Sequence, residues 1–170
     1  MSAAQPASVD ADPNSPTVRA LLRNATEGPH GAARCDRVLA LAIEHFRADS
    51  GTVHLLHDDG VLHLAAASRG IPEVVLAAVR TVPVGKGMAG LAVERAQPVD
   101  ACNLQTDTSG DVRPGAKATG LQGAIVVPIL RRAADGRERA VGAFGIANRA
   151  ERTFSAAEQA LLVELARTLA

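Results

Sequence analysis

Two cysteines and five histidines are the side chains of this sequence that could attack a substrate or bind a metal. Cys35 and Cys102 are far apart, form no Cys-x-x-Cys pair, and have no adjacent His or Lys to activate the thiol. We expect two reduced thiols, with a disulfide or redox pair as the alternative. The histidines stand at no zinc-binding spacing, so we expect no metal site. His54, His57 and His63 are predicted to lie at a sheet edge or on the surface.

A Gly-Lys-Gly turn at residues 85–87 is the second feature with possible chemistry. Glycines let the backbone turn sharply and approach a ligand closely. The helix predicted to follow, at residues 88–95, would present free N–H groups and its positive end at this turn, which suits an anion or a carbonyl. The alternative is that the glycines only permit a tight strand-to-helix turn.

The composition excludes several classes of function. Lys plus Arg and Asp plus Glu each number 18, so no net charge draws the chain onto nucleic acid or an anionic membrane. The chain has three Phe and no Trp or Tyr, which is too few aromatic rings for a base-stacking platform. No apolar run approaches the ~20 residues of a membrane span, and the N-terminus shows no signal-peptide pattern. No Ser-His-Asp or paired-carboxylate signature is recognisable, so we expect a cytoplasmic protein that is not an enzyme.

The chain is predicted to form one domain over residues 15–170, after a disordered tail over residues 1–14. Apolar residues at helical spacing predict helices, and alternating runs around the turn Asp58-Asp59-Gly60 predict a hairpin. The predicted helices are residues 15–27, 33–48, 70–79, 88–95 and 155–170, and the predicted strands are 52–57, 61–68, 81–84, one beginning at 98, 123–130 and 140–148. A long polar stretch, residues 100–117, indicates a functional loop or a hidden helix. This order predicts an α+β fold, with a central antiparallel sheet of five or six strands and the N- and C-terminal helices on one face.

Five segments resemble, in the same order, segments of GAF domains. They are residues 84–93, 97–100, 124–129 with its Val-Pro pair, 141–148 and 154–166. The resemblance covers residues 33–170. It implies the profilin-like GAF sheet and a non-enzymatic regulatory module that senses a small molecule. A ligand-free dimerisation module and an enzyme are the alternatives.

Single residues test the other chemistries of that family. Bilin-binding members attach their chromophore through a Cys followed by His, whereas Cys102 is followed by Asn103. The free methionine sulfoxide reductases, which are the enzymatic alternative, carry cysteines where this chain has Ala89 and, near the Val-Pro strand, Lys117. Without a thiolate nucleophile a sulfoxide is not attacked.

A degenerate form of the motif of cyclic-nucleotide GAF domains is present in Asn148-Arg149, Phe154 and Glu158-Gln159. From this resemblance we predict an Arg149–Glu158 ion pair between the end of the last strand and the last helix. We interpret it as a structural clasp and not as a nucleotide contact.

The resemblance also places the ligand under two covering segments, residues 86–95 and 100–122. The candidate ligand-binding residues are Lys86, Met88, Asn103, Arg113, Lys117, Thr119 and Gln122, with Val126 and Ala143 as apolar walls. The basic members favour a small anion or carboxylate, as in the stand-alone GAF proteins that bind nitrate for a sensor kinase. Asp107 and Asp111 could neutralise them, and a purely solvated loop is the alternative.

The terminal helices are predicted to carry the signal and to self-associate. These helices carry more apolar side chains than one helix face needs for burial against its own sheet, namely Leu21, Leu22, Leu162 and Leu169. Two-fold pairing with a second copy would bury the remainder. We expect a homodimer that reports to a sensor kinase or another signalling protein. No cofactor, nucleic-acid partner or membrane partner is expected.

Overall fold

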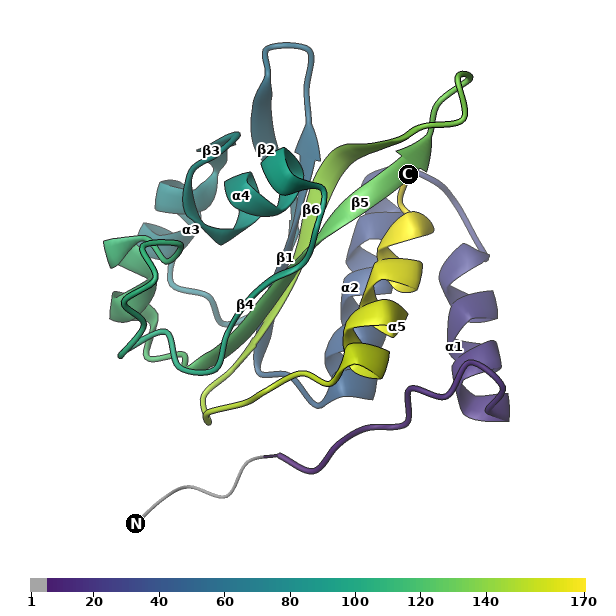
Figure 1. The fold of residues 1–170 in the computed structure, drawn as a ribbon, viewed down its shortest axis with the longest axis horizontal. Coiled ribbons are helices and arrows are strands. Elements are labelled where there is room, and N and C mark those ends of the chain that lie inside the picture. Colours follow the sequence, from purple (N-terminus) through teal and green to yellow (C-terminus); the bar gives the residue numbers. More distant parts are fainter. Residues whose placement is uncertain (1–5) are drawn as a thin grey trace.

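A six-stranded antiparallel sheet forms the centre of the computed structural model, which describes residues 6–170 apart from the side chains of residues 117 and 118 (Figure 1). The strands are β1 (Ser50–Leu56), β2 (Val61–Ala67), β3 (Thr81–Pro83), β4 (Val99–Ala101), β5 (Gly123–Arg132) and β6 (Glu138–Asn148). Their order across the sheet is β3-β2-β1-β6-β5-β4, and every neighbouring pair is antiparallel. The predicted sheet is therefore confirmed.

Helices cover both faces of this sheet. They are α1 (Pro16–Thr26), α2 (Ala32–Phe46), α3 (Glu73–Val79), α4 (Gly87–Arg95), the 3-10 helix η1 (Pro114–Thr119) and α5 (Ala156–Arg167). The helices α1, α2 and α5 lie together on one face, as predicted for the terminal helices, and α3, α4 and η1 lie on the other (Figure 1). The short helix η1 begins inside the long polar stretch and ends two residues beyond it, so that stretch does contain part of a hidden helix.

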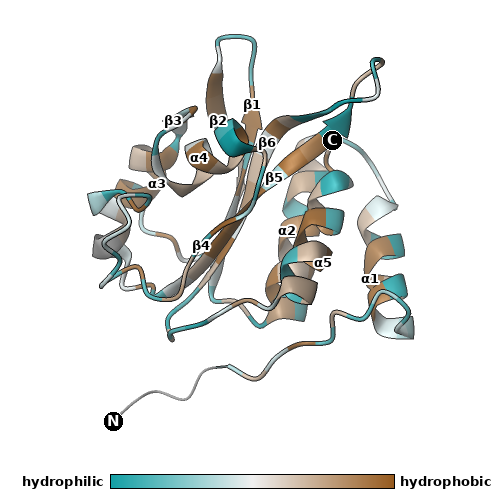
Figure 2. Ribbon diagram, in the orientation of Figure 1, coloured by the Kyte–Doolittle hydropathy of each residue, from teal (hydrophilic) through white to brown (hydrophobic). Residues whose placement is uncertain are grey.

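Alternation along the central strands separates the two layers. Ile125, Phe144 and Ile146 are buried against α1, α2 and α5 in the main core. Because successive strand side chains point to opposite faces, the residues between them face the layer of α3, α4 and η1. Figure 2 shows hydrophobic residues through the middle of β5 and hydrophilic ones near the hairpin at its end.

Local signals set the ends of the terminal helices. Ser15 caps α1 by accepting the Thr17 N–H at 3.2 Å. The capping box of α5 is reciprocal: the Ser155 hydroxyl accepts the Glu158 N–H at 3.1 Å, and the Glu158 carboxylate accepts the Ser155 N–H at 2.8 Å. Such a box satisfies two of the N–H groups that a helix leaves unpaired.

Two of the four leucines invoked for a dimer are buried within the single chain. Leu21 is 7% exposed and Leu162 is 0% exposed, both in the main core. Leu22 and Leu169 pack against that core but stay partly exposed. The four leucines are therefore not all surplus as predicted, because Leu21 and Leu162 pack within the main core of the single chain.

The segment before α1 contacts the body of the domain. Residues 1–5 of the predicted tail lie outside the described residues. The Val9 N–H donates to Glu158 Oε1 at 3.2 Å, and His45 Nε2 donates to the Asp10 carbonyl at 2.7 Å. This leading segment therefore joins α1 to α5 and α2. Among the described residues, no helix is both long and apolar enough to cross a membrane.

Candidate ligand cavity

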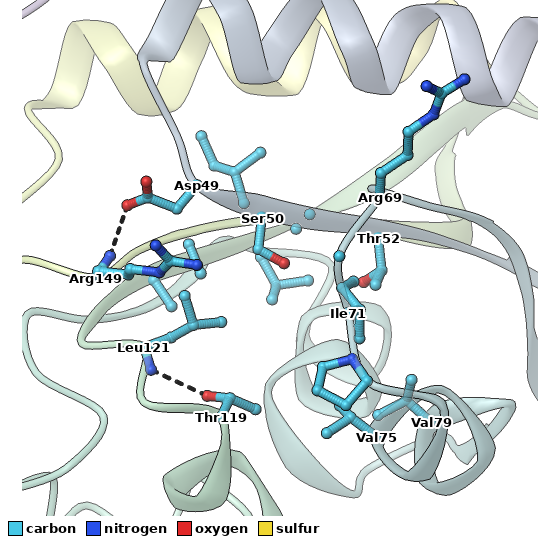
Figure 3. A pocket seen from close by; sticks show the side chains of 18 residues that line it. Asp49, Ser50, Thr52, Arg69, Ile71, Val75, Val79, Thr119, Leu121 and Arg149 are labelled. Atoms are coloured by element: carbon cyan, nitrogen blue, oxygen red, sulfur yellow. Dashed lines mark hydrogen bonds between the residues drawn. The ribbon is translucent and has the colours of Figure 1, made fainter.

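A cavity of about 240 Å³ lies between the sheet and the layer formed by α3, the end of η1 and the segment after η1 (Figure 3). Its described lining comes from β1, the chain before α3, α3 itself, residues 119 and 121, and the facing sides of β5 and β6. The lining residues are Asp49, Ser50, Gly51, Thr52, Arg69, Gly70, Ile71, Pro72, Val75, Val79, Thr119, Leu121, Ala124, Val126, Gly145, Ile146, Ala147 and Arg149.

Small residues on the sheet make the cavity possible. Gly145 is paired with Thr52 on one side and Val126 on the other, and Ala124 and Ala147 form the neighbouring pair. A Cβ at Gly145 would stand 3.1 Å from Val126 Cγ2. Larger side chains at these positions would fill the space that α3 spans, so the floor of the cavity depends on glycine and alanine.

The wall opposite this floor is helix α3, which is weakly anchored. It contributes Val75 and Val79 to the lining, and none of its residues is buried. Its last carbonyl, that of Val79, accepts a hydrogen bond from His54 Nε2 at 2.8 Å. An element with so little buried surface is expected to open more readily than the core.

His54 itself corrects the prediction of an edge or surface histidine, because it is only 3% exposed. A β-bulge between Val53 and His54 shifts the register of β1 against β2 at this residue. Burial lowers the pKa of His54, and the hydrogen bond to Val79 opposes that shift only in part. The ring is therefore a neutral donor to the end of α3.

The other two strand histidines lie on the β1–β2 hairpin, as predicted. His57 is exposed and His63 is half-buried. Their rings stack with centroids 4.1 Å apart, and His63 Nε2 lies 2.8 Å from Asp59 Oδ2. Among the described residues, no group of three His, Cys, Asp or Glu side chains could hold a metal ion.

Three charged residues of the described lining stand at the rim of the cavity. The Asp49 carboxylate accepts the backbone N–H of Arg149 at 2.8 Å. In Figure 3 the Arg149 guanidinium extends from that backbone toward Ser50 and Leu121, whereas Arg69 points away from the cavity. Among the described lining residues, the rim therefore carries one more positive charge than negative, and one of its cations faces the cavity.

The ion pair predicted between Arg149 and Glu158 is wrong, because Arg152 is the partner of Glu158. Arg152 Nη2 lies 3.3 Å from Glu158 Oε1, and both side chains are 3% exposed. The same guanidinium donates to Asn148 Oδ1 at 3.1 Å and to the Phe46 carbonyl at 2.5 Å. Its central carbon stands 4.4 Å from the centre of the Phe154 ring. The clasp between the last strand and α5 exists as predicted, but with a different arginine.

Glu158 is ionised within this clasp. Burial alone would raise the pKa of Glu158, but N–H donors from Ser155 and Val9 and the charge of Arg152 outweigh it and hold the pKa below its ordinary value of 4.5. Hydrogen bonding and an opposite charge both favour the charged form of a carboxyl group.

Thr119 is the only one of the predicted ligand-binding residues with a described side chain that lines the cavity. Lys86 is exposed ahead of α4, and Met88 packs with Ala101, Leu104 and Ala124. Arg113 lies against the turn, because a Cβ at Gly87 would stand 2.7 Å from its Cδ. The side chain of Lys117 lies outside the described residues.

The remaining predicted contacts have structural partners. Asn103 Nδ2 donates to Glu151 Oε1 at 2.6 Å, and the backbone of Gln122 bonds to Asn148 and Leu104. Asp111 pairs with Arg95 through two bonds of 3.0 and 3.2 Å, so it does not neutralise Arg113 as considered from the sequence.

Of the two predicted apolar walls, Val126 lines the cavity. Ala143 does not line it and packs with Leu62 and Val82 in a cluster that Val126 also contacts.

The rim arginines were missed because their role depends on where strands end in space. Arg149 directly follows β6, and Arg69 follows β2, so both are brought to one end of the sheet by antiparallel pairing. The strand alternation through residues 145, 147 and 149 is the sequence signal that would have assigned Arg149 to the cavity face.

The cysteines lie away from the cavity lining. Cys35 is buried in α2, Cys102 is exposed after β4, and both are free thiols. Burial and the charge of Asp36 raise the pKa of the Cys35 thiol, which keeps it protonated. A protonated thiol is a poor nucleophile.

Comparison with known proteins gives one family. A family model described as a GAF domain matches residues 33–170. No curated protein matches the sequence. The GAF domain of an Acinetobacter phosphoenolpyruvate-protein phosphotransferase is 20% identical, with a TM-score of 0.72 over 90% of this chain and 87% of that chain. A corresponding domain from Coxiella burnetii is 22% identical, with a TM-score of 0.71 over 89% and 87%.

Enzymes share the same fold. The free methionine-R-sulfoxide reductase from Neisseria meningitidis, solved in complex with its substrate, is 20% identical, with a TM-score of 0.73 over 99% of this chain and 93% of that chain. At these identities the likeness concerns the fold and not the chemistry.

Proposed function

This chain belongs to the GAF domain family, and we propose that it is a regulatory module that senses a small molecule in the cavity under α3. The observation that carries the proposal is the cavity itself, whose walls are largely apolar and whose rim presents the Arg149 guanidinium. Concave sites with apolar walls and a few convergent polar groups are the usual form of a ligand site.

The ligand class that the rim favours is a small anion or a carboxylate. Arg149 replaces Lys86 and Arg113 as the source of positive charge, since those two do not line the cavity and the side chain of Arg69 points away from it. The volume of about 240 Å³ is below the ~300–1,000 Å³ of typical ligand pockets, which favours a small ligand over a tetrapyrrole.

We propose that the module is not an enzyme. Thiol chemistry of the reductase type needs a thiolate at the bound substrate, and neither Cys35 nor Cys102 belongs to the described lining. If reduction of free methionine sulfoxide coupled to thioredoxin is measured and Cys102→Ser abolishes it, this part of the proposal is wrong.

The signal is proposed to leave through the terminal helices. Strand β6 presents Gly145 and Ala147 to the cavity and Phe144 and Ile146 to the core around α2 and α5. A sensor kinase or another signalling protein is the class of partner that we expect to receive it.

Native mass spectrometry of the freshly purified chain tests the proposal, because a bound small molecule adds mass that denaturation releases. Val75→Phe places a larger side chain in the cavity wall and is expected to abolish the added mass. Val74→Phe is the matched control, since Val74 is the preceding residue of α3 and is 76% exposed. Equal retention of ligand by both variants would place the ligand elsewhere.

A further inference from the structure

Arg149 belongs to the cavity face of the sheet by its position in the chain. Strand side chains alternate, so Gly145 and Ala147 face the cavity while Ile146 and Asn148 face the helices. Arg149 follows in the same alternation, one residue beyond the end of β6, and lines the rim. Its placement is therefore set by the register of the central strand.

The guanidinium of Arg149 is not used by the fold. Arg152 occupies the position opposite Glu158, whose two oxygens accept bonds from Arg152, Val9 and Ser155. Asp49 accepts the backbone N–H of Arg149 and so fixes where its side chain begins. Among the described residues, the guanidinium makes no hydrogen bond or ion pair. Arg149 is exposed, and a cation whose backbone is held but whose guanidinium has no partner among the described residues is available to a ligand.

The interior beyond this cation is largely apolar, with the hydroxyls of Ser50, Thr52 and Thr119 as the uncharged polar side chains of its described lining. Ile71, Val75 and Val79 form one wall, and Leu121 and Val126 form the other. An inorganic oxyanion placed in that interior would lose water on every side, which is costly, and Arg149 is the one cation of the described lining that faces it. A carboxylate is different, because its planar oxygens match a guanidinium with two parallel hydrogen bonds while the carbon attached to it enters the apolar space.

Resting on the proposed function, we propose that Arg149 selects the charge of the ligand and that the ligand is a monocarboxylate with a short apolar body. The carboxylate lies at the rim against Arg149, and the apolar body lies between α3 and Val126. The cavity of about 240 Å³ has the volume of about eight water molecules at ~30 Å³ each, which suits a body of a few carbon atoms.

Calorimetry on the full chain tests this with isovalerate as the probe, its uncharged isostere isovaleramide, and nitrate and phosphate as inorganic anions. We expect isovalerate to bind at least tenfold more tightly than the amide and than both inorganic anions. Arg149→Gln is expected to weaken isovalerate at least tenfold and to leave the amide unchanged. Arg69→Gln, at the same rim but pointing away, is expected to change isovalerate less than threefold.

The outcomes separate this inference from the proposed function. If Val75→Phe abolishes binding but Arg149→Gln does not weaken it, the cavity is the site and Arg149 does not select the charge. If nitrate or phosphate binds as tightly as isovalerate, the ligand class is wrong. If no probe binds at millimolar concentration while native mass spectrometry finds another small molecule, the monocarboxylate is wrong and the proposed function stands.

Discussion

Replacing Arg152 should cost far more stability than replacing Arg149, although the sequence motif points to Arg149. Arg152 is 3% exposed and joins Glu158, Asn148 and the carbonyl of Phe46, so three elements meet at its guanidinium. Arg152→Met removes all of these bonds and leaves the Glu158 charge buried without its cation. Arg149→Met removes an exposed side chain whose backbone contact to Asp49 does not need the guanidinium.

The magnitude follows from the burial of the pair. Removing one partner of a buried ion pair costs about 3–5 kcal/mol, because the other charge stays desolvated. The N–H groups of Ser155 and Val9 still serve Glu158, so we expect the lower half of that range, about 3–4 kcal/mol. An exposed substitution changes stability by about 0.5 kcal/mol or less. Against a total of ~5–15 kcal/mol for a domain, the first loss is large and the second is small.

Urea unfolding followed by far-ultraviolet circular dichroism is the suitable assay, since the chain has no Trp or Tyr for fluorescence. With a slope of about 2 kcal/mol per molar, Arg152→Met should lower the midpoint by roughly 1.5–2 M. Arg152→Lys, which keeps the charge and loses the fork of donors, should fall between the wild type and Arg152→Met. Equal losses for Arg149→Met and Arg152→Met, or a loss below about 1 kcal/mol for the latter, would refute the assignment of the clasp.

Three further predictions concern the elements around the cavity and the helices. Burial lowers the pKa of His54 below its ordinary 6.5, so the unfolded chain binds the proton more readily than the folded chain. The free energy of unfolding should therefore fall as the pH falls through and below 6.5. Urea midpoints at several pH values should fall less steeply in His54→Gln than in the wild type. Val9→Pro, which removes the N–H that Glu158 accepts at 3.2 Å, should lower stability by about 1 kcal/mol more than Val9→Ala and should increase hydrogen exchange at the start of α5. Light scattering at tens of micromolar should find a dimer that Leu22→Glu with Leu169→Glu converts to monomer, and a monomeric wild type contradicts self-association.

The order and type of the elements could be predicted from the sequence because their signals are local. The hairpin turn at residues 58–60 needs only its own residues, and the capping box of Ser155 needs only the three residues that follow. The same holds for the start of α1, where Ser15 precedes a proline. Each of these interactions closes within one helical or β-turn, so no knowledge of the tertiary fold is required.

The site could not be predicted in the same way because it depends on register and on contacts across the chain. A β-bulge beside His54 turns a residue read as exposed into a buried donor to α3. Glu158 had two candidate arginines within nine residues, and only the path of the chain after β6 decides between them. Lys86 and Arg113 are basic, as the sequence indicates, but both lie at the start of α4. The cavity lies under α3, and neither residue lines it.

Strand β6 contacts both the cavity and the ends of two helices. Beyond Ala147, which lines the cavity, β6 ends at Asn148, and Asn148 bonds to the carbonyl of Arg47 at the end of α2. Arg152, four residues later, donates both to Asn148 and to Glu158, which lies in the first turn of α5. Packed interiors transmit small shifts and do not absorb them. A ligand that moves the Arg149 backbone must therefore move this polar network or break the bond between the Arg149 N–H and the Asp49 carboxylate. Ligand binding would therefore first shift the N-terminus of α5 and the leading segment at Val9.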